Sequence, residues 1–180
     1  MKLDNNMIGN IIGKLLGKKL TLGELMSIDQ GRISRASEVQ PRLVKVYHEL
    51  KKESILDKFR SIFTGKTGLL MYYVIFKFEV KSKSGNTYEV FIKLSPDFSM
   101  TNWQNNTCEI YCGCKDFQYR SAYLLGKNDS LFLNDKIKIA LGQALTVAPK
   151  EKTITTTLCK HSYACIQYIV KNYGNLMKTI

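Results

Sequence analysis

The sequence has little proline, an odd number of cysteines and no long hydrophobic run. With 3 prolines and 12 glycines in 180 residues, it is neither collagen-like nor of low complexity. No apolar run reaches the roughly 18 residues that a membrane-spanning helix needs. The 5 cysteines cannot all pair with one another. We therefore expect reduced thiols or metal ligands in place of a disulfide framework.

The amino terminus does not have the pattern of a secretory signal. The apolar stretch over residues 8–22 is interrupted by Lys14, Lys18 and Lys19, and no small-residue cleavage pattern follows it. We therefore expect a protein that is made and kept inside a cell.

The sequence does contain enough apolar residues for a core, and it has a large excess of positive charge. Hydrophobic residues make up 44% and aromatic residues 11%, which excludes a disordered chain. The 27 Lys and Arg residues outnumber the 15 Asp and Glu residues, so the net charge is +12. Because no block of five like charges occurs, this charge indicates either a polyanion nearby or only a solvated basic surface.

Glycine and apolar patterning divide the chain into two parts. Residues 1–40 mix short apolar stretches with glycines that weaken helices, and we expect an N-terminal arm with a short helix that a neighbouring subunit orders. Residues 41–180 are expected to form a single α+β domain. Pro41 suits the first position of a helix, and apolar residues then recur at roughly helical spacing, which predicts a helix over 41–63.

An antiparallel β-hairpin is the clearest predicted element. Residues 69–80 and 88–94 are rich in β-branched and aromatic side chains, and Ser-Gly-Asn turn chemistry lies between them. Three further elements are predicted, namely a short strand over 107–111 and helices over 116–125 and 160–177. Residues 126–158 fit no single element. The predicted fold class is α+β, with an N-terminal arm and helix, a hairpin-based sheet and a C-terminal helix linked to that sheet by a metal.

The metal is expected because cysteine and histidine occur in two close pairs, Cys112-Gly113-Cys114 and Cys159-Lys160-His161. Residues i and i+2 of an extended segment point the same way, so the first pair presents two thiols to one side. The second pair falls where the last helix should begin. Three thiolates and one imidazole fill a tetrahedral shell, which suits a structural Zn²⁺ site with no open position. Basic residues beside the ligands could offset the net charge of about −1 that such a site carries.

Residues near these four in the sequence are expected either to pack around the metal site or to serve as a substitute ligand. Cys165 lies four residues after His161 on the same helical face, so it is either a substitute ligand or a packing residue. Phe117, Tyr119 and Arg120 are expected to pack around the site.

Two other motifs indicate no catalytic chemistry. Gly65-Lys66-Thr67 resembles the end of a phosphate-binding loop, but Arg60 stands where that loop needs its first glycine. His48 belongs to no Ser/His/Asp arrangement, and a nucleophilic cysteine would need a histidine as its base. Because the chain has 2 histidines and His161 is assigned to the metal, we expect a protein that is not an enzyme.

The pattern C-x-C…C-x-H resembles a SWIM-type zinc finger, a β-hairpin and helix module found in transposase-like and other DNA-linked proteins. This resemblance implies one alternative function, a zinc-dependent nucleic-acid-binding module that acts in the host cell.

A longer stretch, roughly residues 69–170, resembles a group of tailed-bacteriophage virion proteins. In that group a Tyr-x-Val hairpin precedes C-x-C-x-x-F-x-[YF]-R, and C-K-H ends the motif. Here the two parts read Cys112 to Arg120 and Cys159 to His161, with Pro149 in the loop before the second. The resemblance implies a structural subunit of the virion, in the neck, a portal-adjacent ring or the tail. It also implies synthesis in the bacterial cytoplasm, a homo-oligomeric ring and contacts with other virion proteins. The basic surface adds non-specific contact with packaged DNA.

Overall fold

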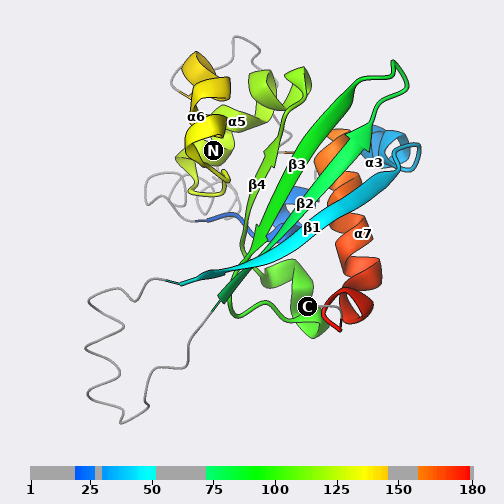
Figure 1. The fold of residues 1–180 in the computed structure, drawn as a ribbon, viewed down its shortest axis with the longest axis vertical. Helices are drawn as coiled ribbons and strands as arrows, with labels where there is room; N and C mark the ends of the chain where they lie inside the picture. The colour runs from blue at the N-terminus through cyan, green and yellow to red at the C-terminus, as the bar shows by residue number, and fades with distance from the viewer. Residues whose placement is uncertain (1–18, 27–29, 52–71, 146–157, 179–180) are drawn as a thin grey trace, which may run out of the picture.

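A four-stranded antiparallel sheet with one long helix across it forms the centre of the molecule (Figure 1). The structure is a computed structural model, and it describes residues 19–26, 30–51, 72–145 and 158–178. The strands follow chain order across the sheet: β1 (Pro41–Leu50), β2 (Tyr72–Lys81), β3 (Thr87–Leu94) and β4 (Cys108–Cys112). The long helix is α7 (Lys160–Leu176). The predicted α+β class is confirmed.

Strands β2 and β3 form the predicted hairpin, and β4 is the predicted third strand. The turn between β2 and β3 is closed by the Ser82 N–H, which donates to the Asn86 carbonyl over 2.8 Å. Gly85 in this turn has a φ of +86°, a left-handed conformation that glycine adopts without strain. The strand residues predicted over 69–71 lie outside the described part of the chain.

The helix predicted over 41–63 is wrong in its described part, where the chain forms β1. A β-bulge adds Val44 after Leu43, so β1 has one residue more than its partner β2 at this point. Leu43 and Val46 therefore face the same side of the sheet although they are three residues apart. A spacing of three is what an amphipathic helix would show, and this explains the error. Residues 52–63 lie outside the described ranges.

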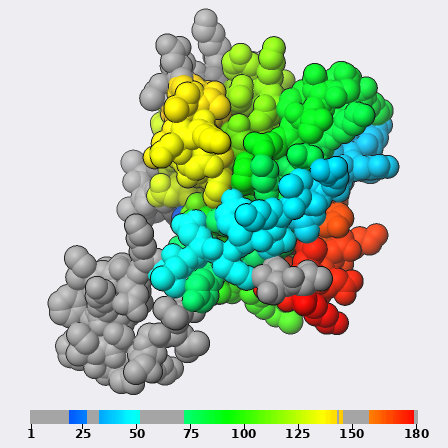
Figure 2. Space-filling model, viewed as in Figure 1, coloured from blue at the N-terminus to red at the C-terminus, as the bar shows by residue number. Residues whose placement is uncertain are grey.

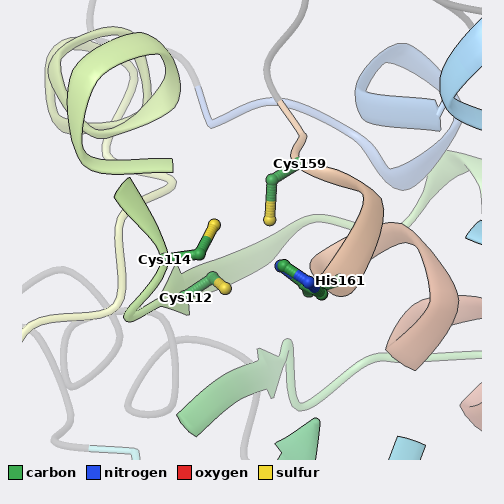
Figure 3. Close-up of side chains that lie close together, drawn as sticks. All are labelled: Cys112, Cys114, Cys159 and His161. Atoms are coloured by element: carbon green, nitrogen blue, oxygen red, sulfur yellow. The ribbon is translucent and has the colours of Figure 1, made fainter. Parts of the chain in front are cut away.

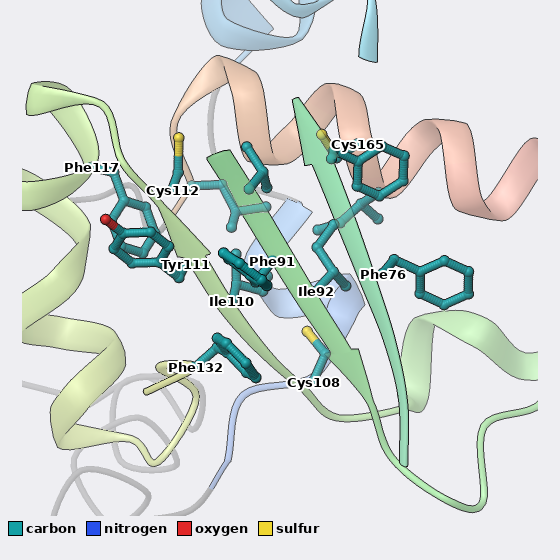
Figure 4. Close-up of a cluster of buried hydrophobic side chains, with 14 of the residues drawn as sticks. Phe76, Phe91, Ile92, Cys108, Ile110, Tyr111, Cys112, Phe117, Phe132 and Cys165 are labelled. Carbon is teal, nitrogen blue, oxygen red and sulfur yellow. The ribbon is translucent and has the colours of Figure 1, made fainter. Parts of the chain in front are cut away.

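One face of the sheet is buried under α7 (Figure 4). Alternate residues of three strands form this face, and all are buried: Phe76, Phe78 and Val80 on β2, Val90, Ile92 and Leu94 on β3, and Cys108, Ile110 and Cys112 on β4. The ring of Tyr168 on α7 meets the edge of Phe78, with centroids 5.6 Å apart. Burial of such large apolar side chains, at about 1.5–3 kcal/mol each, holds the helix to the sheet.

The segment after β4 covers part of the opposite face. It contains a π-helical turn (Phe117–Ser121), α5 (Ala122–Lys127), α6 (Asp135–Leu141) and a 3-10 turn (Gly142–Leu145). Phe132 stacks on Phe91 of β3 with centroids 5.1 Å apart. The Asn134 side chain caps α6 by accepting from the Ile137 N–H over 2.9 Å. The helix predicted over 116–125 is confirmed, and the segment left unassigned contains α6.

The described part of the predicted N-terminal arm packs on its own chain. It forms α2 (Leu22–Met26) and α3 (Gln30–Ala36), and it adds Leu22, Leu25 and Ala36 to the core. The Leu22 N–H also donates to the Asn106 carbonyl over 2.8 Å, next to the 3-10 turn η1 (Met100–Asn105). These apolar contacts pack the described residues of the segment on their own chain, and ordering of the arm by a neighbouring subunit stays a prediction. Residues 1–18 lie outside the description.

Strand β1 lies along the surface, and Figure 2 shows it in cyan across the front of the molecule. Its residues are half-buried or exposed throughout. In the described ranges, we find no helix with both the length and the apolar character needed to cross a membrane.

Candidate metal centre

Four side chains from two distant segments of the chain converge where β4 ends and α7 begins (Figure 3). They are Cys112, Cys114, Cys159 and His161, the four predicted ligands. One ligand atom from each, three sulfurs and an imidazole nitrogen, lie within 4.8 Å of one another, and all four residues are buried. The structure thus brings together residues that are separated by 44 positions between Cys114 and Cys159.

The sheet and the turn after it position the first pair. Cys112 is paired with Val90 of β3, which fixes its sulfur on the face of the sheet covered by α7. Cys114 lies in the turn that follows, where the backbone N–H of Phe117 donates to its Sγ over 3.3 Å. Hydrogen bonds of this kind orient a ligand and favour its thiolate form.

Gly113, between these two cysteines, makes a tight backbone contact but has no special conformation. Its N–H donates to the Glu89 carbonyl over 3.0 Å, and its φ is not in the left-handed region. A Cβ atom at this position would lie 3.5 Å from the Tyr111 hydroxyl, an ordinary van der Waals contact. The structure therefore shows no steric or conformational requirement for glycine at position 113.

The start of α7 positions the second pair. Cys159 is the N-cap residue, and its sulfur accepts a hydrogen bond from the Ser162 N–H over 3.5 Å. The Ser162 hydroxyl lies 3.3 Å from the same sulfur. His161 lies in the first turn, where its ring faces Tyr88 of β3 with centroids 5.0 Å apart. The positive end of the helix dipole favours a thiolate at the Cys159 position.

The three thiols differ in acidity because they share one small buried volume. Burial raises the pKa of Cys112 well above its usual value. A hydrogen bond with Cys112 acts to lower the pKa of Cys114, but Cys159 and burial together raise it to about 12. Burial also acts to raise the pKa of Cys159, yet its interactions with the other two thiols, with His161 and with Ser162 lower it well below the usual value. Without a cation, one thiolate is favoured and the others are not.

The histidine shows that these residues fit a metal ion. Only 5% of His161 is exposed, and neither of its ring nitrogens has a hydrogen-bond partner. A buried polar atom without a partner costs about 1–3 kcal/mol, and coordination of a metal by one of the two nitrogens removes that penalty for the coordinating atom. The donor set of three sulfurs and one imidazole nitrogen, with no carboxylate in the group, suits a thiophilic ion held by four protein ligands.

The three residues predicted to pack around the site lie in different surroundings. Phe117 is fully buried and meets the Tyr111 ring edge-on, with centroids 5.8 Å apart. Tyr119 is 67% exposed, so the expectation that it packs around the site is wrong, because the π-helical turn presents it to the surface. Arg120 is also exposed at the surface, where it forms an ion pair with Asp116 over 3.2 Å. It does not pack around the sulfurs.

The remaining thiols lie outside the cluster of four. Cys165 is buried on α7 and does not belong to the group of close ligand atoms, so its role as a substitute ligand stays a prediction. Cys108 is buried at the other end of β4, opposite Leu94. His48 is an exposed residue of β1 whose ring lies 6.1 Å from that of Tyr72. Gly65-Lys66-Thr67 lies outside the described residues.

Sequence reasoning missed two contributors to the centre. Ser162 could have been found, because a residue three positions after a helix N-cap offers its N–H to the capping side chain. Tyr88 could not, because its place beside His161 depends on how α7 crosses the sheet.

The chain matches no protein-family model, no curated protein and no solved structure.

Proposed function

We propose that the four residues bind one Zn²⁺ ion as a structural centre, and that the chain is a non-enzymatic structural subunit of a larger particle. The observation that carries this proposal is the buried group of four ligand atoms, all within 4.8 Å of one another, between β4 and α7. Four protein ligands complete a tetrahedral zinc shell, which leaves no position for a substrate or a reactive water.

The centre would act as a cross-link across a large part of the fold. It joins the last strand of the sheet to the helix that covers the sheet, and α5 and α6 lie in the chain between its two halves. The free energy of zinc binding contributes directly to folding when the site does not exist in the unfolded chain. A subunit with a small core gains stability in this way.

The kind of particle is proposed from the resemblance of the motif to tailed-phage virion proteins. The phenylalanine of that motif has a clear place here, since Phe117 is buried and supports Cys114.

Two measurements test the two parts of this proposal separately. Metal analysis of the purified chain should give about one zinc per chain, and a chelator should lower its melting temperature. A folded chain that contains no metal and is insensitive to chelators would contradict the zinc centre. Mass spectrometry of purified phage particles should detect the chain at many copies per particle, and its absence would contradict the virion role.

A further inference from the structure

A groove of about 730 Å³ opens beside the metal centre, and Cys114 and His161 form part of its wall. Three separate parts of the fold contribute cationic side chains to it, namely α3, the turn after β4 and the first turn of α7. These side chains are Arg35, Lys115, Arg120 and Lys160. Arg35, Lys115 and Arg120 are exposed and Lys160 is half-buried.

The positive charge of this groove exceeds what the metal centre needs for neutrality. In the part of the chain that the structure describes, one carboxylate lines the groove, that of Asp116, and it is paired with Arg120. A zinc ion with three thiolates and one imidazole adds a charge of about −1. Four cations against these two negative charges leave a net charge of about +2. The nearby carboxylate of Glu38 also interacts electrostatically with Lys160 and Arg35, but it pairs with Lys83 over 2.7 Å, and the two side chains together add no net charge.

The other side chains that line the groove indicate which anion it fits. They are polar or aromatic, from Asn86, Tyr88 and Gln118, and among the described residues no aliphatic side chain contributes to the wall. The centre of a protein–protein interface is apolar, which argues against an acidic protein as the occupant. Nucleic-acid phosphates are bound by Arg, Lys and amide side chains, which are the groups present here.

The same lining favours duplex over single-stranded nucleic acid. Proteins that bind single strands without sequence preference stack bases on exposed aromatic rings. The aromatic residue of this groove is Tyr88, and its ring is already packed against that of His161. We propose that the groove binds the phosphate backbone of double-stranded DNA through Arg35, Lys115, Arg120 and Lys160, without reading its sequence. This activity goes beyond the structural role and does not depend on it.

The test is the binding of the zinc-loaded full chain to a short random-sequence DNA duplex, measured by fluorescence anisotropy at several salt concentrations. The Lys115→Gln/Lys160→Gln variant removes two groove cations and leaves all four ligands in place. Its matched control is Lys136→Gln/Lys178→Gln, which changes the net charge equally at exposed lysines outside the groove. We expect the groove variant to bind about tenfold more weakly and its salt slope to fall by about 2, while the control stays near wild type.

Three outcomes would overturn the proposal. They are equal weakening by the control pair, no salt-dependent binding by the wild-type chain, and tighter binding of a polyglutamate peptide or a single strand than of the duplex. Zinc content and melting temperature, measured on every variant, separate a failure of DNA binding from a failure of the metal centre. If Lys160→Gln lowers either value, Arg35→Gln, a change at an exposed residue of α3, replaces it in the same comparison.

Discussion

The backbone N–H of Phe117 donates to the sulfur of Cys114 over 3.3 Å, while the ring of Phe117 is fully buried against Tyr111. A residue that is not a ligand therefore fixes the position of one that is. Phe117→Ala should lower the free energy of unfolding by about 3–5 kcal/mol through the cavity that it leaves. It should also weaken zinc affinity, because the turn that orients Cys114 loses its anchor.

Tyr119, two residues later, is the matched control for this effect. Since Tyr119 is 67% exposed, Tyr119→Ala should change stability by no more than about 0.5 kcal/mol and leave zinc affinity unchanged. Denaturant unfolding and competition with a zinc indicator measure both quantities. Similar losses in the two variants would contradict the roles that the structure gives these side chains.

Loss of a ligand should have the largest effect of any single substitution. Cys112→Ser and His161→Ala each leave an incomplete shell, and structural zinc contributes about 10–16 kcal/mol in small domains, comparable with the whole stability of a domain. We expect both variants to lose zinc and to lose cooperative thermal unfolding. Cys108→Ala, a buried thiol outside the cluster, should keep its zinc and unfold cooperatively. Unchanged melting in both ligand variants would refute a structural metal centre.

The role of Cys165 is decided by one substitution. If this thiol only packs, Cys165→Ala should retain about one zinc per chain and lose about 1 kcal/mol of stability, because a small buried group is removed. Zinc content by mass spectrometry under native conditions and the melting temperature give the answer. A loss of zinc that matches that of Cys112→Ser would make Cys165 a ligand.

Gly113→Ala tests whether the segment between the first two cysteines needs a glycine. The added Cβ makes ordinary contacts, and the backbone conformation is open to any residue. We expect zinc to be retained and stability to rise by up to about 1 kcal/mol, since alanine restricts the unfolded chain more than glycine does. Zinc loss or a lower melting temperature in this variant would show that the bend does require glycine.

The parts of the fold that were predicted correctly have local sequence patterns whose meaning tertiary contacts do not change. The hairpin follows from alternating β-branched and aromatic residues over β2 and β3. The convergence of the four side chains follows from their chemistry, because cysteine and histidine in two close pairs are the residue types and the spacing that favour a common metal site. Neither prediction requires knowledge of how the segments are arranged in space.

The errors arise where tertiary structure changes the meaning of a local pattern. The bulge at Val44 gives β1 a spacing of three, and Pro41, which suits a helix start, equally suits the first residue of an edge strand. Tyr119 is exposed because it lies in a π-helical turn, and the local sequence does not predict that turn. Arg35 is far in sequence from the other cations of the groove. It lines the groove because α3 packs against α7.

The chain-order sheet has a consequence for how the newly made protein matures. The pairings of β2 with β3 and of β3 with β4 each close a short connection, whereas the ligand pairs are 44 residues apart. Local pairings form early and distant ones late. The sheet of β2, β3 and β4 can therefore form before α7 is attached to it, and binding of a metal at the proposed centre would be a late step that completes the fold.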